Sequence, residues 1–145
     1  MTFKIVPERR RDAALIEPLL DRAFGFDRRR KTVYRLRAGV APVDRLRFVA
    51  LAGDGIGRGL VGHGLARAKR AGAGLCVIVG EPAYYAPFGF RNASAAGLIL
   101  PGPVEPERFQ VLEIVPGALA GVTGLIGKAE EDGAPGRGLR DAVAG

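Results

Sequence analysis

The sequence predicts an α/β fold, because strand patterns and helix patterns alternate along the chain. Residues 75–79 form a near-continuous apolar run, which is typical of a strand buried on both faces in a parallel sheet. The chain has 145 residues, of which 48% are hydrophobic, so it can form one compact domain with its own core. We therefore expect one domain over residues 1–126 and, over 127–145, a flexible tail with few residues to bury.

Five elements are predicted in the first half of the chain. They are a strand over 2–6, a helix over 12–24, a basic helix over 28–38, a strand over 47–51 and a helix over 56–70. The first helix contains Pro18, which should remove a backbone hydrogen bond and kink it. The second helix should end at Gly39. Glycines weaken the third helix, since each interior glycine costs about 1 kcal/mol relative to alanine.

The second half begins with the apolar strand over 75–79 and continues with shorter elements. Glu81 is typical of a helix cap, and the proline after it of the first residue of a short helix over 82–85. Two more strands are expected over 95–100 and 109–115, with a proline-rich segment between them.

The formal net charge of +7 favours anionic partners such as phosphates, nucleic acid or membrane surfaces, without choosing among them. No apolar run approaches the roughly 18 residues of a membrane span, and no basic start with an apolar stretch marks a signal peptide. The single cysteine, Cys76, cannot form an internal disulfide, which suits a reducing compartment. We therefore expect a cytoplasmic protein that does not contact a membrane.

Three other features are expected to serve structure more than chemistry. His63 has no second histidine or cysteine at metal-ligand spacing, so we expect no metal site. Cys76 lies in an apolar strand and should be an inert hydrophobic residue. The basic run over 28–37 should form a solvated helix face, with binding of phosphates or nucleic acid as the alternative.

A glycine-rich stretch over 53–59 follows the strand over 47–51 and opens the helix over 56–70. Unpaired backbone N–H groups and the positive end of the helix dipole make such a position suitable for a phosphate. An ordinary flexible turn is the alternative.

This stretch also matches a dinucleotide fingerprint. Residues 57–62, Gly-Arg-Gly-Leu-Val-Gly, fit the pattern G-x-G-x-x-G, and Glu81 follows 19 residues later, where a ribose-binding acid belongs. The register disagrees, because a fingerprint that starts at the strand end, at Gly53, has Arg58 where the third glycine is required. A dinucleotide-binding unit therefore stays an alternative.

Three stretches of the chain resemble the GCN5-related N-acetyltransferases, the GNAT family. Residues 55–60, Gly-Ile-Gly-Arg-Gly-Leu, resemble the loop that binds the pyrophosphate of acetyl-CoA. Residues 79–90 resemble the Y-x-x-x-G-F block, in the G-[DE]-P-x-Y-Y-x-x-F-G-F form of one branch of the family. The opening, with residues 19–24 and 28–37, is similar to the same branch. The resemblance implies a GNAT-like mixed sheet with helices on both faces.

The resemblance also implies a reaction, the transfer of an acetyl group from acetyl-CoA to the amine of a small molecule or peptide. It implies no metal, and we expect no nucleic acid as partner. The pyrophosphate would lie on backbone N–H groups at the start of the third helix. The residues concerned are Asp54, Gly55, Ile56, Gly57, Arg58 and Gly59. Tyr85 holds the position of the proton donor, since a phenol with a pKa of about 10 can protonate the departing thiolate, while Tyr84 is expected to be a packing residue.

The chain departs from the family between residues 51 and 55. Family members have two further long strands there, and Ala52 stands where the family has the Gln or Arg that opens the glycine motif. We expect that about 35 residues are absent near 52–54, which is the length of two or three strands with turns. The sheet would then be truncated in its antiparallel half. The family's acidic base, and the backbone N–H that polarises the thioester carbonyl, would be lost with it.

The truncation leaves several functions open. Acetyl transfer would be impaired, and no general base can be named. Either the segment over 48–51 takes the place of the lost strand beside 75–79, or the chain is a deleted relative that no longer catalyses well. A sheet that lacks strands should have an exposed edge or a shallow core, and such an edge can pair with another chain in a homo-oligomer. The alternatives to acetyl transfer are a non-catalytic module that binds CoA or a nucleotide, a Rossmann-like unit, and a basic nucleic-acid binder.

Overall fold

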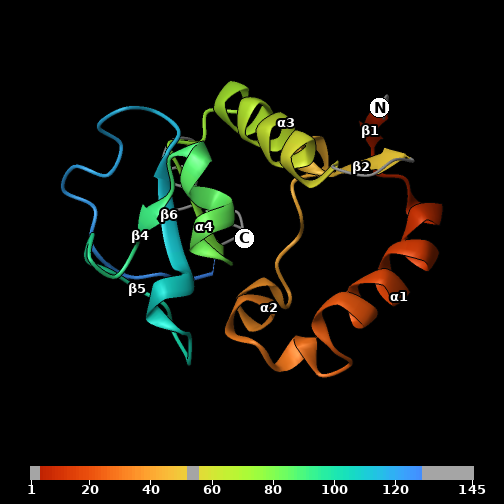
Figure 1. Ribbon diagram of the computed structural model, residues 1–145, viewed down its shortest axis with the longest axis horizontal. Coiled ribbons are helices and arrows are strands. Elements are labelled where there is room, and N and C mark those ends of the chain that lie inside the picture. Colours follow the sequence, from red (N-terminus) through yellow and green to blue (C-terminus); the bar gives the residue numbers. More distant parts are fainter. Residues whose placement is uncertain (1–3, 52–55, 129–145) are drawn as a thin grey trace.

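Strands and helices alternate along the chain in the computed structural model, which describes residues 4–51 and 56–128 (Figure 1). Within these residues the strands form three separate sheets. β1 (Lys4–Pro7) pairs antiparallel with β2 (Phe48–Leu51), β6 (Phe109–Glu113) lies between β3 (Leu75–Val79) and β4 (Arg91–Asn92), and β5 (Leu98–Ile99) pairs parallel with β7 (Gly124–Leu125). The α/β class, with mixed strand directions, is confirmed.

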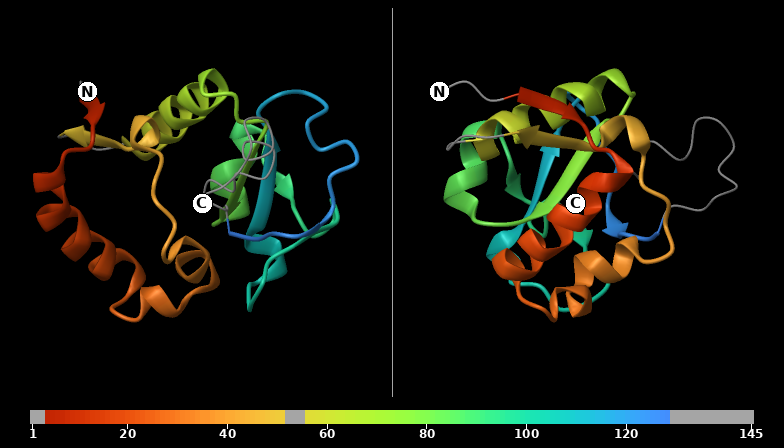
Figure 2. Two further views of the ribbon diagram at one scale, coloured as in Figure 1. Left: turned by 180° about the vertical axis from the view of Figure 1, so that it is seen from behind. Right: turned by 90° about the vertical axis from the view of Figure 1, so that its right-hand side faces the viewer.

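Four α-helices lie between the strands in the described part of the chain. They are α1 (Ala13–Phe24), α2 (Thr32–Arg37), α3 (Ile56–Arg70) and α4 (Pro82–Tyr85). One of them, α3, connects two of the sheets. Figures 1 and 2 show α3 running between the β1–β2 pair and the sheet of β3, β6 and β4. α1 leads from the β1–β2 pair toward α2, on the side of the molecule opposite β4.

The hydrophobic core lies around β3 and β6. Phe109 and Val111 on β6 are 1% and 0% exposed. They belong to one cluster with Leu75, Val77, Ala93, Leu98, Leu100, Leu119 and Ile126. By contrast, α1 contains no buried residue, and its Leu15 and Leu19 are 76% and 56% exposed. The core therefore belongs to the second half of the chain.

Elements with strong local signals begin and end where the sequence predicts. α3, β3 and α4 have the predicted bounds. α1 continues through Pro18 to Phe24. The predicted basic helix over 28–38 is a 3-10 turn over Arg28–Arg30 followed by the short α2.

Two predictions about strands are wrong. The strand expected over 95–100 is reduced to the two residues of β5, because the Ala95 N–H donates to Asn92 Oδ1 at 2.8 Å and the chain turns there. β3 is antiparallel to its neighbour β6, and not part of a parallel sheet. A short apolar run marks a buried strand, but it does not encode the direction of the strand beside it.

Two predicted features lie outside the described residues. These are the expected deletion at 52–54 and the expected tail beyond residue 128. At the start of that tail, Lys128 Nζ donates a hydrogen bond to Ala38 O at 2.7 Å. In the described structure β2 pairs with β1 and not with β3, so it does not take the place of a lost strand beside β3.

Candidate active site

The start of α4 is held by hydrogen bonds to β6 and to the turn before it. The Gly80 N–H donates to Arg108 O at 2.9 Å, and the buried Gln110 donates from Nε2 to Gly80 O at 3.0 Å. Glu81 then occupies the N-cap position, and its carbonyl accepts N–H bonds from Tyr84 and Tyr85. Glu81 is therefore the helix cap that the sequence predicts, but its side chain makes no capping hydrogen bond, and the main chain closes this turn.

The ring of Tyr85 is fixed by close neighbours. A Cβ at Gly80 would clash with Tyr85 Cε2 and would lie 3.1 Å from Cδ2, so glycine leaves room for the ring in this position. Tyr85 also meets Phe90 and Tyr84 edge to face, with ring centroids 5.5 Å and 4.9 Å apart. Tyr85 is half-buried by these contacts.

The environment keeps the Tyr85 hydroxyl protonated. Burial raises the pKa of Tyr85, the charges of Tyr84 and Cys76 raise it further, and the positive charge of Arg108 partly opposes them. A group that must donate a proton at neutral pH needs to stay in this form.

Tyr84 connects this tyrosine pair to the start of α3. A Cβ built at Gly57 would lie 2.5 Å from the Tyr84 hydroxyl oxygen, so the hydroxyl rests against the backbone of Gly57. The structure thus brings the start of the glycine-rich helix beside the Tyr-Tyr block. Ile56, Gly57, Arg58 and Gly59 form the first turn of α3, while Asp54 and Gly55 lie outside the described residues.

Tyr85 lines a pocket of about 690 Å³. One wall is formed by the end of α1, the following turn and α2, including Tyr34 and Arg37. The other wall is formed by the end of β3, α4 and residues 100–108, including Val79 and Arg108. A small molecule in this pocket would contact the predicted proton donor directly.

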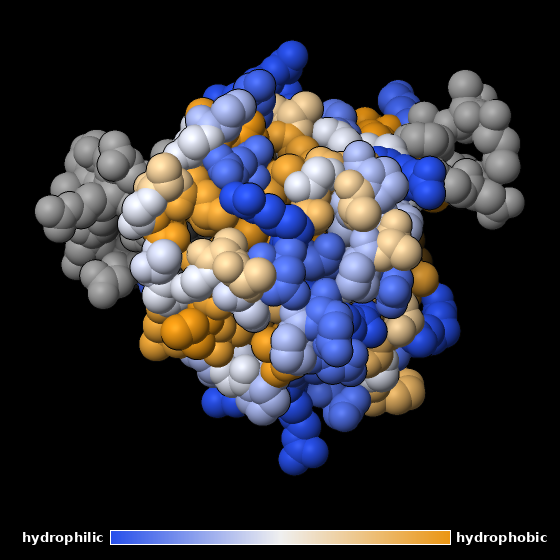
Figure 3. All heavy atoms as spheres, turned by 60° about the vertical axis from the view of Figure 1, so that its left-hand side comes forward, coloured by the Kyte–Doolittle hydropathy of each residue, from blue (hydrophilic) through white to orange (hydrophobic). Residues whose placement is uncertain are grey.

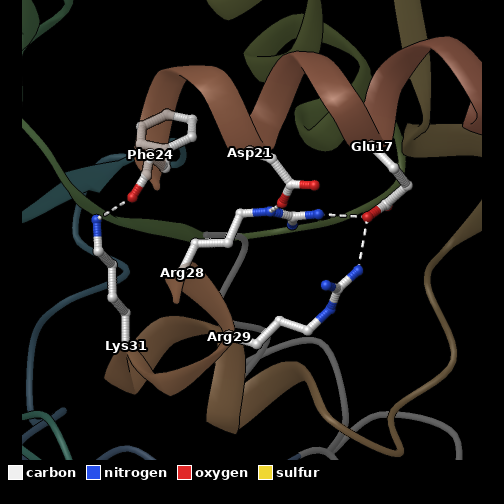
Figure 4. A network of polar contacts seen from close by, with 6 residues as sticks. All are labelled: Glu17, Asp21, Phe24, Arg28, Arg29 and Lys31. Atoms are coloured by element: carbon white, nitrogen blue, oxygen red, sulfur yellow. Dashed lines mark hydrogen bonds and ion pairs between the residues drawn. The ribbon is translucent and has the colours of Figure 1, made fainter. Parts of the chain in front are cut away.

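The α2 wall is anchored to α1 by an ion-pair network (Figure 4). Arg28 is only 2% exposed; its Nε donates to Asp21 Oδ1 at 2.8 Å, and its Nη2 bonds Glu17. Arg29 adds a bond to the same Glu17 carboxylate at 2.7 Å, and the guanidinium of Arg28 lies 5.1 Å from the ring centre of Tyr34. The ion pairs raise the pKa of Arg28, so it stays charged. The predicted solvated face is therefore wrong for Arg28.

A second contact holds α2 against the far wall. The Thr32 hydroxyl, at the start of α2, donates to Pro103 O at 2.7 Å. A Cβ at Gly102 would lie 2.7 Å from that same hydroxyl oxygen. The two walls of the pocket therefore meet at a close contact between α2 and the proline-rich segment.

Sequence reasoning did not find Tyr34, Arg37 and Arg108 as pocket residues. The first two lie in the basic run, where nothing in the spacing distinguishes one residue from another. Arg108 ends a 3-10 turn before β6 and belongs to no motif. The contact between the two walls brings Tyr34 and Arg37 to Tyr85, whereas Arg108 lies on the same wall as Tyr85, where its carbonyl accepts the Gly80 N–H.

Cys76, the other residue considered for chemistry, has the surroundings of a core residue. Cys76 is buried, and burial raises its pKa to about 11, which agrees with an inert thiol. Within residues 4–51 and 56–128, there is no cluster of three or more His, Cys, Asp or Glu side chains that could hold a metal ion. No helix of this described part is long and apolar enough to cross a membrane.

Known proteins with this sequence pattern and fold are found in Escherichia coli. The chain is 32% identical over 149 residues to the uncharacterized N-acetyltransferase YhbS of strain K12, a match that covers 79% of this chain and 89% of the relative. YhbS of strains O6:H1 and O157:H7 gives the same figures. The 1.55 Å crystal structure of the GNAT family N-acetyltransferase YhbS in complex with CoA matches with a TM-score of 0.64 and 29% identity, over 85% of this chain and 87% of that one. No protein-family model matches the chain.

The fold, the tyrosine block and these relatives define an N-acetyltransferase that uses an acyl-CoA. The chain belongs to the GNAT family, and its class of reaction is the transfer of an acetyl group from acetyl-CoA to an amine. Membership of the GNAT family, which the sequence resemblance implies, is thereby confirmed.

The comparison also bears on length. The match to YhbS spans 149 residues but uses 79% of the 145 residues of this chain, so YhbS has residues inside the match that this chain lacks. The truncated GNAT-like fold is in accord with this difference. The position of the missing segment, near 52–54, stays a prediction.

The dinucleotide-binding alternative is wrong. A Rossmann-like unit needs the strands before and after its helix in one parallel sheet. The strands that flank α3 are β2 and β3, and they belong to different sheets in the described structure.

Proposed function

We propose that this chain holds acetyl-CoA with its pyrophosphate at the first turn of α3 and uses Tyr85 to protonate the departing CoA thiolate. The observation that carries the proposal is the contact between the Tyr84 hydroxyl and Gly57. It puts the glycine motif one residue away from Tyr85, so a single extended coenzyme can reach both. The acceptor is the amine of a small molecule or peptide.

The reaction needs three events at the thioester. The neutral amine attacks the carbonyl carbon, the C–S bond breaks with its electron pair going to sulfur, and the phenolic proton of Tyr85 passes to that sulfur. The proton released by the attacking nitrogen restores the phenol through solvent. Tyr85 is suited to this role because burial keeps its pKa raised and its ring is fixed against Gly80.

The start of α3 supplies the groups that a pyrophosphate needs. Backbone N–H groups of the first turn of a helix have no partner within the helix and point toward its N-terminus. The described part of the proposed site is Ile56–Gly59, and Asp54 and Gly55 complete it by sequence. Gly57 itself carries no side chain, and the Tyr84 hydroxyl lies where its Cβ would be, so the phenol would stand beside a pyrophosphate bound at this turn.

Low turnover is expected of this chain. General acid or base assistance is typically worth 10²- to 10⁴-fold, and one donor to a developing oxyanion about 10²- to 10³-fold. A chain that lacks the family's base and carbonyl donor would depend mainly on the positioning of its two substrates. We also propose that it acts in the cytoplasm, where Cys76 stays reduced.

Calorimetry with CoA, acetyl-CoA, NAD and NADP tests the proposed coenzyme. CoA and acetyl-CoA should bind, and Gly57→Glu should abolish binding, because a carboxylate would stand in the place of a phosphate. Gly62→Glu is the matched control: it adds the same charge to the same helix at a position with no neighbour within 4 Å of a Cβ. Tight binding of NAD that is lost in Glu81→Ala would contradict the proposal. CoA binding without release of thiol from acetyl-CoA with any amine would indicate a non-catalytic binding module.

A further inference from the structure

We propose that the pocket beside Tyr85 selects acceptor amines that carry a second, anionic group, a carboxylate or a phosphate. This proposal depends on the function proposed above and adds the chemical class of the acceptor.

The pocket lies on the side of the tyrosine pair away from the coenzyme loop. Tyr84 touches the first turn of α3 through Gly57, whereas Tyr85 lines the pocket. None of the described residues of α3 contributes to the pocket lining. A molecule in the pocket would therefore meet Tyr85 from the side opposite the pyrophosphate, where the acceptor has to enter.

Basic side chains outnumber acidic ones in this pocket. The basic ones are Arg30, Lys31, Arg35, Arg37 and Arg108. They face only two carboxylates among the described lining residues, Asp27 and Glu105. A concave surface with an excess of positive charge concentrates anions, and apolar walls such as Ile78 and Val79 strengthen the field.

Two of these arginines are placed to hold an anion. Within the described residues neither Arg37 nor Arg108 has a carboxylate partner in an ion pair. The guanidinium of Arg37 stands 5.6 Å from the ring centre of Tyr34, which orients it by a cation–π contact. Arg108 is close enough for its charge to act on Tyr85. Arginine binds carboxylates and phosphates through two parallel N–H bonds, so both residues suit the proposed anion.

The same charge favours the reactive form of the acceptor. Only the neutral amine attacks a thioester, and nearby positive charges lower the pKa of an ammonium group. The positive charge of this pocket would repel a simple ammonium ion. An amine that also carries an anionic group is attracted through that group, and the same positive charge makes its ammonium nitrogen lose a proton more easily. The pocket could thus partly replace the base that the chain lacks.

Matched pairs of acceptors test the proposal. The pairs are O-phosphoethanolamine with ethanolamine, and β-alanine with β-alaninamide, each assayed for thiol release at saturating acetyl-CoA. The anionic member of each pair should have at least about tenfold higher kcat/KM, in line with 1.4 kcal/mol for a factor of ten. The Arg37→Gln/Arg108→Gln double variant should remove this preference. Arg22→Gln, an exposed arginine of α1 that does not line the pocket, is the control and should keep it.

Binding is measured as well, because turnover is expected to be low. Broadening of the NMR signals of O-phosphoethanolamine should occur with protein saturated with CoA, and it should be weak for ethanolamine and for the double variant. Equal rates and equal binding for the members of each pair would overturn the proposal, as would an equal loss in Arg22→Gln. Displacement of O-phosphoethanolamine by CoA would also overturn it, because the anion would then occupy the coenzyme site. A chain that binds no CoA and releases no thiol would instead contradict the proposed function.

Discussion

The glycines of α3 differ in their surroundings, although all four lie in the same continuous helix. A Cβ at Gly57 would meet the Tyr84 hydroxyl, whereas a Cβ at Gly62 would meet nothing within 4 Å. The small size of Gly57 is therefore required by a neighbour, and that of Gly62 is not. We therefore expect substitutions at Gly57 and at Gly62 to have different effects.

Gly62→Ala should raise the free energy of unfolding by about 1 kcal/mol, since alanine is favoured over glycine inside a helix. Gly57→Ala should lack this gain and should weaken CoA binding, because Tyr84 has to move away from α3. Urea denaturation and CoA calorimetry of the two variants measure both effects. Equal gains in stability, with CoA affinity unchanged in both, would show that the contact between Tyr84 and Gly57 is unimportant.

Tyr85→Phe should lower kcat by at least about 10²-fold, the lower end for a general acid, while CoA affinity stays nearly the same. The hydroxyl acts on a thiolate that exists only as the thioester breaks, so it contributes little to binding of the ground state. The acid works while protonated. Because its pKa is raised, the rate of the parent should fall only when the pH rises above the usual range for a tyrosine. Equal rates for parent and variant at saturating acetyl-CoA would make Tyr85 a packing residue only.

At the scale of elements, the sequence predicts those parts whose signals are local. The bounds of α3, β3 and α4 follow from helical spacing, an apolar run and a proline at the first helical position. β4, β5 and β7 have two residues each, and their pairing depends on partners far along the chain, so no local pattern could predict them. The residues of the candidate site likewise include some that the sequence predicts and some that it does not. Tyr85 and the glycine loop belong to motifs, whereas Arg37 and Arg108 are brought to the pocket by tertiary contacts alone.

The burial of Arg28 is another tertiary effect with a testable consequence. Arg28→Gln should lower the free energy of unfolding and detach α2 from α1, because Glu17 and Asp21 lose a shared partner and the ring of Tyr34 loses its cation. Arg29→Gln is the matched control, since Arg29 is 67% exposed and its ion pair should be worth only about 0 to 1 kcal/mol. Chemical denaturation compares the two variants. A loss in Arg28→Gln no larger than in Arg29→Gln would contradict a structural role for this network.

At the scale of the whole molecule, the two halves of the chain differ in how well their apolar groups are covered. The core surrounds β3 and β6, while α1 exposes Leu15, Leu19 and Phe24. On the side where β4 lies, the surface shows several apolar groups separated by hydrophilic residues (Figure 3). In the described structure β2 pairs only with β1, and β3 only with β6, so each has an edge without a strand beside it. A truncated sheet accounts for the exposed face of α1 and for the open edges of β2 and β3. Strands between β2 and β3 would pair with these edges and give α1 a surface to cover.

We therefore expect the chain to associate with itself. Unpaired edges of apolar strands such as β3 pair readily with other chains, and an apolar helix face without a cover adds to the tendency. Sedimentation at increasing protein concentration should show a rising average mass, and the Leu15→Lys/Leu19→Lys variant should shift it toward the monomer. Leu125→Lys is the control, because Leu125 is 68% exposed and lies on β7, outside α1 and outside the sheets of β2 and β3, so its replacement should leave association unchanged. A parent protein that stays monomeric at all concentrations and unfolds in one sharp transition at high temperature would contradict this expectation, because its edges and the face of α1 would then not be available to a second chain.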